Sequence, residues 1–374
     1  MKQVIVLESR GMVGGACESI RLFIRNMDCR TDLIIPKGEA DYISKRVLKG
    51  YYGSNVEHIY EFYLPYSVEH TVACEVYDAD DMKRRRRIFQ AHRKELERFF
   101  DEKDYDWIHL NGLGLYPVLN RKYPMTLHVR QVFNGGRLEK IRRLYYLNKS
   151  RALIYIDNAA FSPFQEMKKK HLIIANPVDQ TGVNCVSRQE AMEKYGVDDA
   201  CTVFTMAGTV SEGKGVGFVI EAFLDFCKKK SSPCRLLIAG TGEPGYKKLC
   251  SKLAGGHADI RFLGQLSREE MSGLYRATDY MVRAEQKAVT GRTVWEALYC
   301  GVGLVIQGGQ SVREEIAKEM GGCENVYVYK PRDKESLTQV FFDLQGKKTN
   351  GRGRSNAREY AKALSGFVKE ITEA

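Results

Sequence analysis

Long apolar runs are missing from this 374-residue sequence, and none approaches the length of a membrane-spanning helix. The first residues form only a short apolar stretch that turns acidic at Glu8, which is not the pattern of a secretory signal peptide. We find no internal repeat and no low-complexity linker. We therefore expect a cytoplasmic protein, and we keep peripheral contact with the inner face of the membrane as an open alternative.

Closely spaced cysteines are also missing. The ten cysteines, among them Cys17, Cys74, Cys234 and Cys300, lie far apart without any C-x-x-C pair, and several stand inside apolar runs. This spacing favours buried reduced thiols over disulfides or zinc ligands.

Acidic residues are too few to balance the basic ones, because 58 lysines and arginines face 47 aspartates and glutamates and leave a formal net charge of +11. Such an excess indicates an anionic partner. Residues 83–87 and 137–151 are the densest basic stretches, and both can be drawn as amphipathic helices with a cationic face. A solvated helix face is the first interpretation and contact with a membrane surface the second. We expect no nucleic-acid partner, since no recognised nucleic-acid motif accompanies either run.

The chain is long enough for two domains. Short apolar runs alternate with longer periodic ones, which is typical of strands and crossover helices in parallel sheets, so the predicted fold class is α/β. The expected helices include 215–229 and 355–374. The expected strands are 4–8, 32–35, 59–63, 107–111, 125–128, 153–156, 172–175, 202–206, 235–239, 260–263, 280–283, 303–306 and 326–329.

The pattern breaks at Pro177, which ends a strand ladder and biases Asn176 to an extended conformation. We therefore predict a first domain over residues 1–178, a second over 179–354, and a last helix over 355–374 that packs near the first domain. Two similar halves place the chemistry at the carboxyl ends of their strands, facing a cleft.

Residues 290–301 (TGRTVWEALYCG) are the most informative segment. They have the pattern of a polar loop that opens a short helix, where free N–H groups and the helix dipole favour phosphate. Gly291 has no Cβ to keep a ligand from the backbone. Glu296 can accept two hydrogen bonds from a vicinal diol such as that of ribose; a surface helix acid is the alternative. The combination predicts a nucleotide diphosphate, and the rest of the chain suggests an attached sugar.

Glycines mark two further candidate phosphate contacts. Lys214 stands between Gly213 and Gly215 at a helix start, which favours phosphate binding over an ordinary exposed lysine. Gly14 and Gly15 follow the first strand and form either a loop that closes over the diphosphate or a simple turn.

A histidine ends one of the strands. His128 closes the strand 125–128 beside a polar run and should therefore point near the cleft, with a satisfied core histidine as the alternative. His109 and Asn111, on the preceding strand end, are weaker candidates.

Taken in order, these motifs resemble those of retaining glycosyltransferases of the GT-B fold, family four, also called group 1. The resemblance covers nearly the whole chain and depends on the order of seven short motifs. They are residues 14–16 (GGA), 176–179 (NPVD), 207–215 (AGTVSEGKG), 238–244 (IAGTGEP), 260–265 (IRFLGQ), 270–275 (EMSGLY) and the glutamate helix of 290–301.

The resemblance implies two Rossmann-like doubly wound domains that face a central cleft. It also implies a hexosyltransferase that moves a sugar from a nucleotide-diphosphate sugar to a hydroxyl of a glycan or lipid-linked acceptor, with retention and without metal or other cofactor. A role in cell-surface polysaccharide or glycolipid assembly is expected. The implied catalytic residues are His128, Lys214 and Glu296. The implied donor-binding residues are Gly14, Gly15, Gly208, Thr209, Lys214, Gly242, Leu263, Gly264, Gln265, Glu285, Thr290, Gly291, Arg292, Thr293 and Glu296.

Two positions depart from the family pattern. Ala288 stands where the partner of Glu296 is expected, and Glu285 is the nearest acid; Thr209 replaces an arginine. Arg292 is a candidate replacement cation, with surface exposure as the equal alternative. A nucleotide-sugar-binding protein without transfer activity and a sugar epimerase of the same fold therefore stay open.

One acidic cluster suggests a metal-dependent alternative. Asp78, Asp80 and Asp81 resemble the D-x-D motif that holds manganese in the other large glycosyltransferase fold. They immediately precede the basic helix, and acids in a first turn are favoured by the helix dipole, so we interpret them as capping residues.

Overall fold

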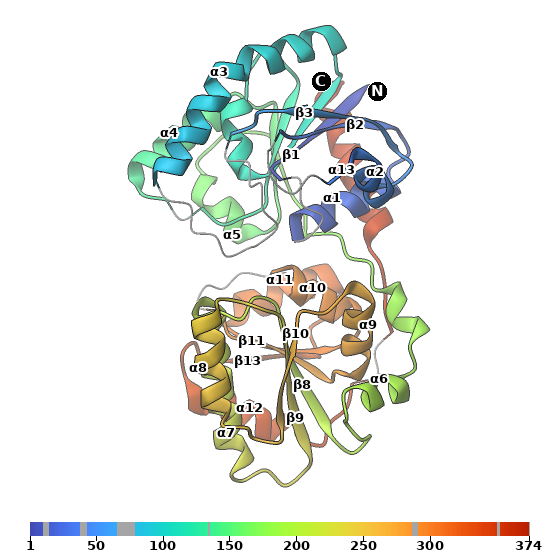
Figure 1. Cartoon of the computed structure of the whole chain (residues 1–374), viewed down its shortest axis with the longest axis vertical. Coiled ribbons are helices and arrows are strands. Elements are labelled where there is room, and N and C mark those ends of the chain that lie inside the picture. The colour runs from blue at the N-terminus through green and yellow to red at the C-terminus, as the bar shows by residue number, and fades with distance from the viewer. Residues whose placement is uncertain are drawn as a thin grey trace. The chain divides into compact units, whose positions relative to one another are not determined.

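The computed structural model describes residues 1–9, 15–37, 43–65, 79–133, 135–285, 291–349 and 352–373; side chains 79–82, 310, 311 and 315 are not described. The chain forms two compact units (Figure 1). Unit 1 comprises Met1–Pro177 and Asn356–Ala374, and unit 2 comprises Val178–Ser355.

A parallel seven-stranded sheet forms the centre of unit 1. In spatial order its strands are β3 (Val56–Phe62), β2 (Thr31–Pro36), β1 (Gln3–Leu7), β4 (Trp107–Asn111), β5 (Met125–Val129), β6 (Ala152–Tyr155) and β7 (His171–Ile173). Successive side chains of β1 point to opposite faces, so Val4 and Val6 join one apolar cluster while Ile5 and Leu7 join the other. Both faces are buried, as parallel sheets require.

Helices cover both faces of this sheet. They are α1 (Gly15–Asn26), α2 (Lys45–Tyr52), α3 (Ala79–Lys103), η1 (Leu113–Val118), α4 (Arg137–Leu147), α5 (Asn158–Phe161), η2 (Ser162–Phe164) and α13 (Ala357–Thr372). The last helix, α13, belongs to unit 1: Tyr360, Leu364 and Val368 are buried beside α1, and the ring of Tyr360 meets that of Phe23 edge-on at 6.2 Å. α13 thus packs within unit 1, although unit 2 precedes it in the chain.

Unit 2 has a parallel six-stranded sheet. In spatial order its strands are β10 (Ile260–Gly264), β9 (Cys234–Ala239), β8 (Thr202–Ala207), β11 (Tyr280–Arg283), β12 (Gly303–Gln307) and β13 (Val326–Tyr329). Its helices are η3 (Thr181–Cys185), α6 (Arg188–Lys194), η4 (Glu212–Lys214), α7 (Val216–Cys227), α8 (Pro244–Ala254), α9 (Arg268–Ala277), α10 (Arg292–Tyr299), α11 (Gln310–Met320) and α12 (Lys334–Leu344). Phe341 of α12 packs against Phe204, Phe223 and Phe226 in the core between α7, α12 and the sheet.

Each sheet has one point at which its strand order reverses. In unit 1 the reversal lies between β1 and β4, and in unit 2 between β8 and β11. Loops after two such strands lead away to opposite sides, which leaves a crevice at their carboxyl ends where open α/β sheets bind ligands. The predicted α/β class is confirmed, and the two reversal points are the places to look for a site.

Within the described residues, no helix combines the length and the apolar character that crossing a bilayer would demand.

Candidate functional site

A small, open pocket lies at the reversal point of unit 2. The ends of β8, β9 and β11 line it, together with the segment that leads into α7. Its lining includes Gly208 and the polar or charged Thr209, Lys214, Arg283 and Glu285. The structure thus gathers four of the predicted donor-binding residues in one place and adds Arg283, which the sequence analysis did not identify.

Glycines allow the loops around this pocket to touch through their backbones. A Cβ on Gly240 would overlap the carbonyl oxygen of Gly208, and one on Gly242 would overlap that of Val210. The Gly240 N–H also donates to the Gly264 carbonyl oxygen at 2.6 Å. The loops after β8, β9 and β10 therefore form one layer, which contains the predicted Gly208, Gly242 and Gly264.

Lys214 is placed over the pocket by the glycine that follows it. Gly215 has a left-handed backbone (φ +69°), and a Cβ there would collide with the backbone of Ala284 at the end of β11. This close approach brings the Lys214 ammonium to the Glu285 carboxylate, with which it forms an ion pair. Lys214 is therefore a paired, half-exposed cation and not an ordinary surface lysine.

Arg283 ends the buried strand β11 and turns its guanidinium toward the start of α10. Its Nη1 donates to Thr293 Oγ1 at 2.6 Å, and its Nη2 donates to Glu285 Oε1. A Cβ on Gly291 would lie 3.1 Å from Nη2, so the glycine of the predicted anion loop leaves room for this side chain. The only indication in the sequence is a cation at the end of an apolar strand, in the segment YMVR.

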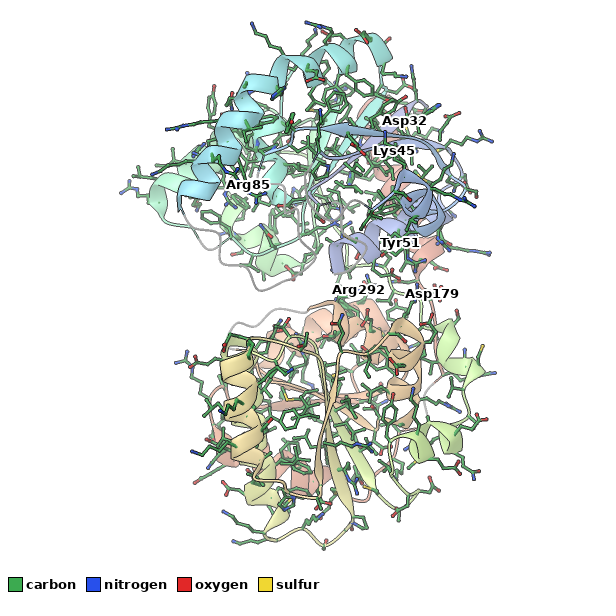
Figure 2. All side chains as sticks on the ribbon, in the orientation of Figure 1. Asp32, Lys45, Tyr51, Arg85, Asp179 and Arg292 are labelled. Carbon is green, nitrogen blue, oxygen red and sulfur yellow. The ribbon has the colours of Figure 1, made fainter. Side chains whose placement is uncertain are left out.

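Glu296 on α10 accepts hydrogen bonds from two side chains. Figure 2 labels one of them, Arg292, on the same helix. Arg292 Nε donates to Glu296 Oε1 at 2.7 Å, and Tyr275 Oη donates to Glu296 Oε2 at 2.9 Å. Both side chains of the ion pair are largely buried, so surface exposure is the wrong interpretation for Arg292 and for Glu296. A carboxylate has about four acceptor positions, so these two contacts do not exhaust Glu296.

A continuous path of contacts joins the two ends of the site. Lys214 pairs with Glu285, Glu285 with Arg283, and Arg283 with Thr293. Thr293 and Glu296 are three residues apart on α10 and therefore lie on one face of that helix. Lys214 and Glu296 thus belong to one connected side of unit 2.

The remaining predicted donor contacts are placed as follows. Leu263 is half-buried near the end of β10, and Gln265 is exposed beyond it, at the same sheet edge as the pocket. Gly15 opens α1 in unit 1, where its carbonyl oxygen accepts from Ser19 Oγ at 2.7 Å. Gly14, Ala288 and Thr290 lie outside the described residues.

The carboxyl group of Glu8 lies at the reversal point of unit 1, between the ends of β1 and β4. Glu8 follows β1, and its two oxygens lie so close to Gly112 and Gly114 after β4 that a Cβ on either glycine would collide with them. The Gly114 N–H donates to the carboxylate, yet burial dominates and raises the pKa of Glu8 to about 7. This contact could not be predicted from the sequence, because the two glycines are remote from Glu8 along the chain.

His128 is fully buried at the end of β5, with its ring 5.6 Å from that of His109. Burial, followed by the charge of Arg130, lowers the pKa of His128 well below its usual value, so the ring is neutral near pH 7. Neither ring nitrogen has a hydrogen-bond partner among the described residues. His128 therefore lies in the interior of unit 1, at the carboxyl end of β5.

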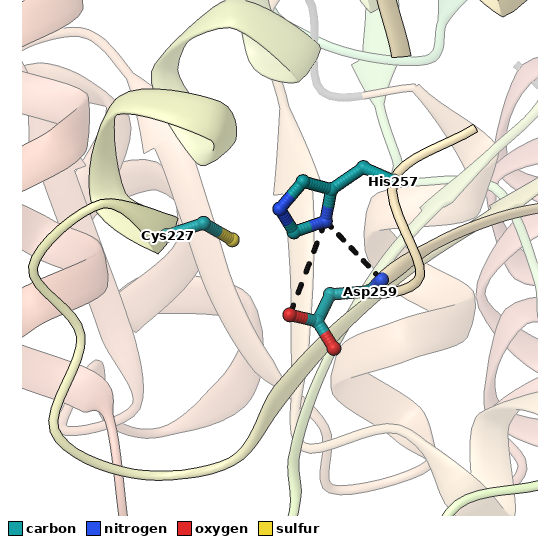
Figure 3. Close-up of side chains that lie close together, drawn as sticks. All are labelled: Cys227, His257 and Asp259. Atoms are coloured by element: carbon teal, nitrogen blue, oxygen red, sulfur yellow. Dashed lines mark hydrogen bonds and ion pairs between the residues drawn. The ribbon is translucent and has the colours of Figure 1, made fainter. Parts of the chain in front are cut away.

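The structure also contains clusters of residue types that can ligate a metal ion. Cys227, His257 and Asp259 lie close together (Figure 3), but at the amino end of β10 and away from the pocket. Burial raises the pKa of the Cys227 thiol to about 11, and Asp259 is paired with Lys230 at 2.5 Å, so neither is a ready ligand. In the D-x-D cluster, Asp80 and Asp81 fall in the first turn of α3, as helix capping requires, and Asp78 lies outside the described residues.

Comparisons with known proteins agree with this geometry. The family described as "Glycosyl transferases group 1" matches residues 187–362, which include the whole pocket of unit 2. No curated protein matches the chain in sequence.

Solved structures share the fold over nearly their whole length. Anabaena Alr3699/HepE in complex with UDP and glucose has a TM-score of 0.68 at 15% identity, covering 100% of this chain and 99% of that one. Sucrose-phosphate synthase from Thermosynechococcus elongatus has a TM-score of 0.69 at 12% identity, covering 100% and 98%. The lipopolysaccharide outer core galactosyltransferase WaaB has a TM-score of 0.64 at 12% identity, covering 99% of each chain.

Proposed function

Because the chain has the GT-B glycosyltransferase fold and its second unit matches the group 1 glycosyltransferase family, we propose that it transfers a hexosyl group from a nucleotide-diphosphate sugar to an acceptor hydroxyl with retention of anomeric configuration. The observation that carries the proposal is the pocket at the reversal point of unit 2, where Lys214, Arg283 and the start of α10 converge. A relative of the same fold is described in complex with UDP and glucose, which supports the same ligand class here.

Each part of the site has a proposed share in donor binding. Lys214 and Arg283 attract the diphosphate, and the remaining acceptor positions of Glu296 receive the ribose diol. The backbone of residues 263–265 holds the base edge. Positive charge is supplied by side chains, so the proposal needs no metal or other cofactor.

Transfer itself requires little covalent chemistry from the protein. The leaving diphosphate accepts the proton of the acceptor hydroxyl on the same face of the sugar, so the anomeric configuration is retained. Catalysis then consists of positioning and of stabilising the charge that develops on the departing phosphate. His128 stays neutral and contributes no proton.

Donor binding and turnover test this proposal. Calorimetry with UDP, GDP and ADP sugars should find one tight donor, and a hydrolysis assay should detect slow turnover without acceptor. Glu296→Ala should abolish donor binding, whereas Glu319→Ala, an exposed helix acid of the same unit, should not. Unchanged affinity in Glu296→Ala would remove this residue from the site.

The replacement of the family's arginine by Thr209 also supports a second candidate, a nucleotide-sugar-binding protein without transfer activity. Tight donor binding with neither hydrolysis nor transfer to any glycan or lipid-linked acceptor would favour it. Product analysis without acceptor separates both from a sugar epimerase.

A membrane surface is the proposed location of the acceptor, in polysaccharide or glycolipid assembly. On the basic helix α4, Leu138, Ile141 and Tyr145 are 84%, 55% and 64% exposed. Their spacing of three and four residues places them on one helix face. Basic residues 137, 140 and 142 share this helix, so a surface with anionic headgroups and an apolar interior suits it.

Vesicle sedimentation tests the membrane contact at moderate salt. Vesicles with anionic lipid should bind the protein better than neutral ones, and replacing Leu138, Ile141 and Tyr145 by serine should remove most of this binding. Val47→Ser, which alters an exposed apolar residue on α2, is the matched control. Equal binding to anionic and neutral vesicles would refute the contact.

A further inference from the structure

One oxygen atom in the unit 2 pocket accepts from two cations. Glu285 Oε1 accepts from Lys214 Nζ and also from Arg283 Nη2. A lysine and an arginine that converge on one anionic oxygen form the arrangement with which proteins hold a terminal phosphate oxygen. Here the oxygen belongs to the chain itself.

Arg283 is the fixed member of this arrangement. Its side chain is only 7% exposed, and Thr293 Oγ1 holds Nη1 from the other side. Its carbonyl oxygen accepts from Tyr329 Oη at 3.0 Å, which ties the end of β11 to β13. The guanidinium is therefore in place before any ligand arrives.

Arg283 also lines the pocket that lacks the arginine expected from the family resemblance. By resemblance to the family an arginine is expected at position 209, and Thr209 lines the same pocket as Arg283. A guanidinium that enters from β11 instead of from the loop after β8 can reach the same anion.

The negative charge of an entering diphosphate repels the Glu285 carboxylate. Lys214 and Arg283 carry two positive charges, of which Glu285 neutralises one. A phosphate bound to the same cations would lie beside the Glu285 carboxylate, and like charges at such short range repel strongly. The carboxylate and the phosphate therefore compete for one position.

We propose that the Glu285 carboxylate occupies the place of a donor phosphate oxygen between Lys214 and Arg283, and that diphosphate binding displaces it and recruits Arg283 as the guanidinium contact. The proposal rests on the proposed function, since it names the groups that bind the donor. It replaces the expectation that Glu285 binds the donor: here Glu285 is a competitor of the diphosphate.

Calorimetry with inorganic pyrophosphate, UDP, GDP and ADP on the full chain tests the proposal, because pyrophosphate requires no base recognition. Glu285→Gln should raise the affinity for pyrophosphate and for the preferred nucleotide about tenfold, as expected when a charged competitor is removed. Arg283→Gln should lower both about tenfold or more, and Arg283→Lys should give a smaller loss because the charge remains but the planar fork is lost.

Asp225→Asn is the matched control, because Asp225 also bridges two lysines of unit 2, Lys228 and Lys334, but outside the pocket. It should leave the affinities unchanged. Thermal unfolding of each variant shows whether it is folded, and Glu285→Gln remains informative even if Arg283→Gln is not.

The outcomes separate the two proposals. If a nucleoside diphosphate binds the wild type but Glu285→Gln weakens the binding, Glu285 assists the ligand and the competitor role is wrong. If Arg283→Gln folds and binds as the wild type does, the role of Arg283 is wrong while the proposed function stands. If the wild type binds neither pyrophosphate nor any of the nucleotides, the proposed function itself fails.

Discussion

Replacing Glu8 by glutamine should change how the stability of unit 1 depends on pH. The carboxyl group lies against the backbone of Gly112 and Gly114, and its pKa rises from 4.5 to about 7 on folding. Because the folded pKa is the higher one, the free energy of unfolding is greatest below pH 4.5 and falls as the pH rises through 7. Glutamine has no charge, so this loss should disappear.

The size of the effect follows from the shift. The difference between 7 and 4.5 is 2.5 units, which at about 1.36 kcal/mol per unit gives an upper limit of about 3.4 kcal/mol. The expected effect on the free energy of unfolding is therefore about 2–3 kcal/mol. The advantage of the variant should be small at pH 5 and should reach this amount at pH 8.

Denaturant unfolding at pH 5, 6, 7 and 8 measures this difference. Trp107 lies in unit 1 and Trp295 in unit 2, and the chain has only these two tryptophans. A Trp295→Phe background therefore leaves fluorescence that reports unit 1. Glu166→Gln, at an exposed position of unit 1, is the control. A Glu8→Gln variant whose stability follows the wild-type pH curve would refute the argument.

Three further predictions concern other parts of the fold. Gly112→Ala should destabilise unit 1 by about 3 kcal/mol or more in denaturant unfolding. The backbone there is left-handed (φ +142°), and the added Cβ would collide with Glu8. Gly136→Ala is the control and should cost little stability, because open space surrounds Gly136. Phe341→Ala should destabilise unit 2 by about 3–5 kcal/mol in thermal unfolding, since it removes the centre of the aromatic core. The pH profile of kcat/KM should contain no ionisation near pH 6.5 that His128→Asn removes, because burial lowers the pKa of this ring well below its usual value. A break near pH 6.5 that vanishes in the variant would contradict this expectation.

The sheets could be predicted because parallel strands buried on both faces are short apolar runs. β1, β8 and β12 are such runs, with every residue buried, and the expected ranges 4–8, 202–206 and 303–306 fall on them. Lys214 and the segment of α10 could be proposed from the sequence because close backbone approach requires glycine beside them.

Contacts between distant segments could not be predicted in this way. Arg283 is a candidate site residue because it donates to Thr293 and shares Glu285 with Lys214. Nothing in the segment YMVR indicates these partners. The sequence left open whether His128 points near a cleft or into the core, because the end of a strand does not reveal what covers it; the structure shows it buried. On α4 the sequence shows an amphipathic helix, but only the structure shows that Leu138, Ile141 and Tyr145 face outward.

The return of α13 to unit 1 has a consequence for synthesis of the chain on the ribosome. Tyr360, Leu364 and Val368 complete the apolar cluster beneath α1, yet they are translated only after all of unit 2. Throughout elongation the first half of the polypeptide therefore exposes an uncovered hydrophobic face, while unit 2 can finish folding earlier. Such a nascent chain is a natural client for chaperones, and a premature stop codon before residue 357 would leave that face permanently open to aggregation.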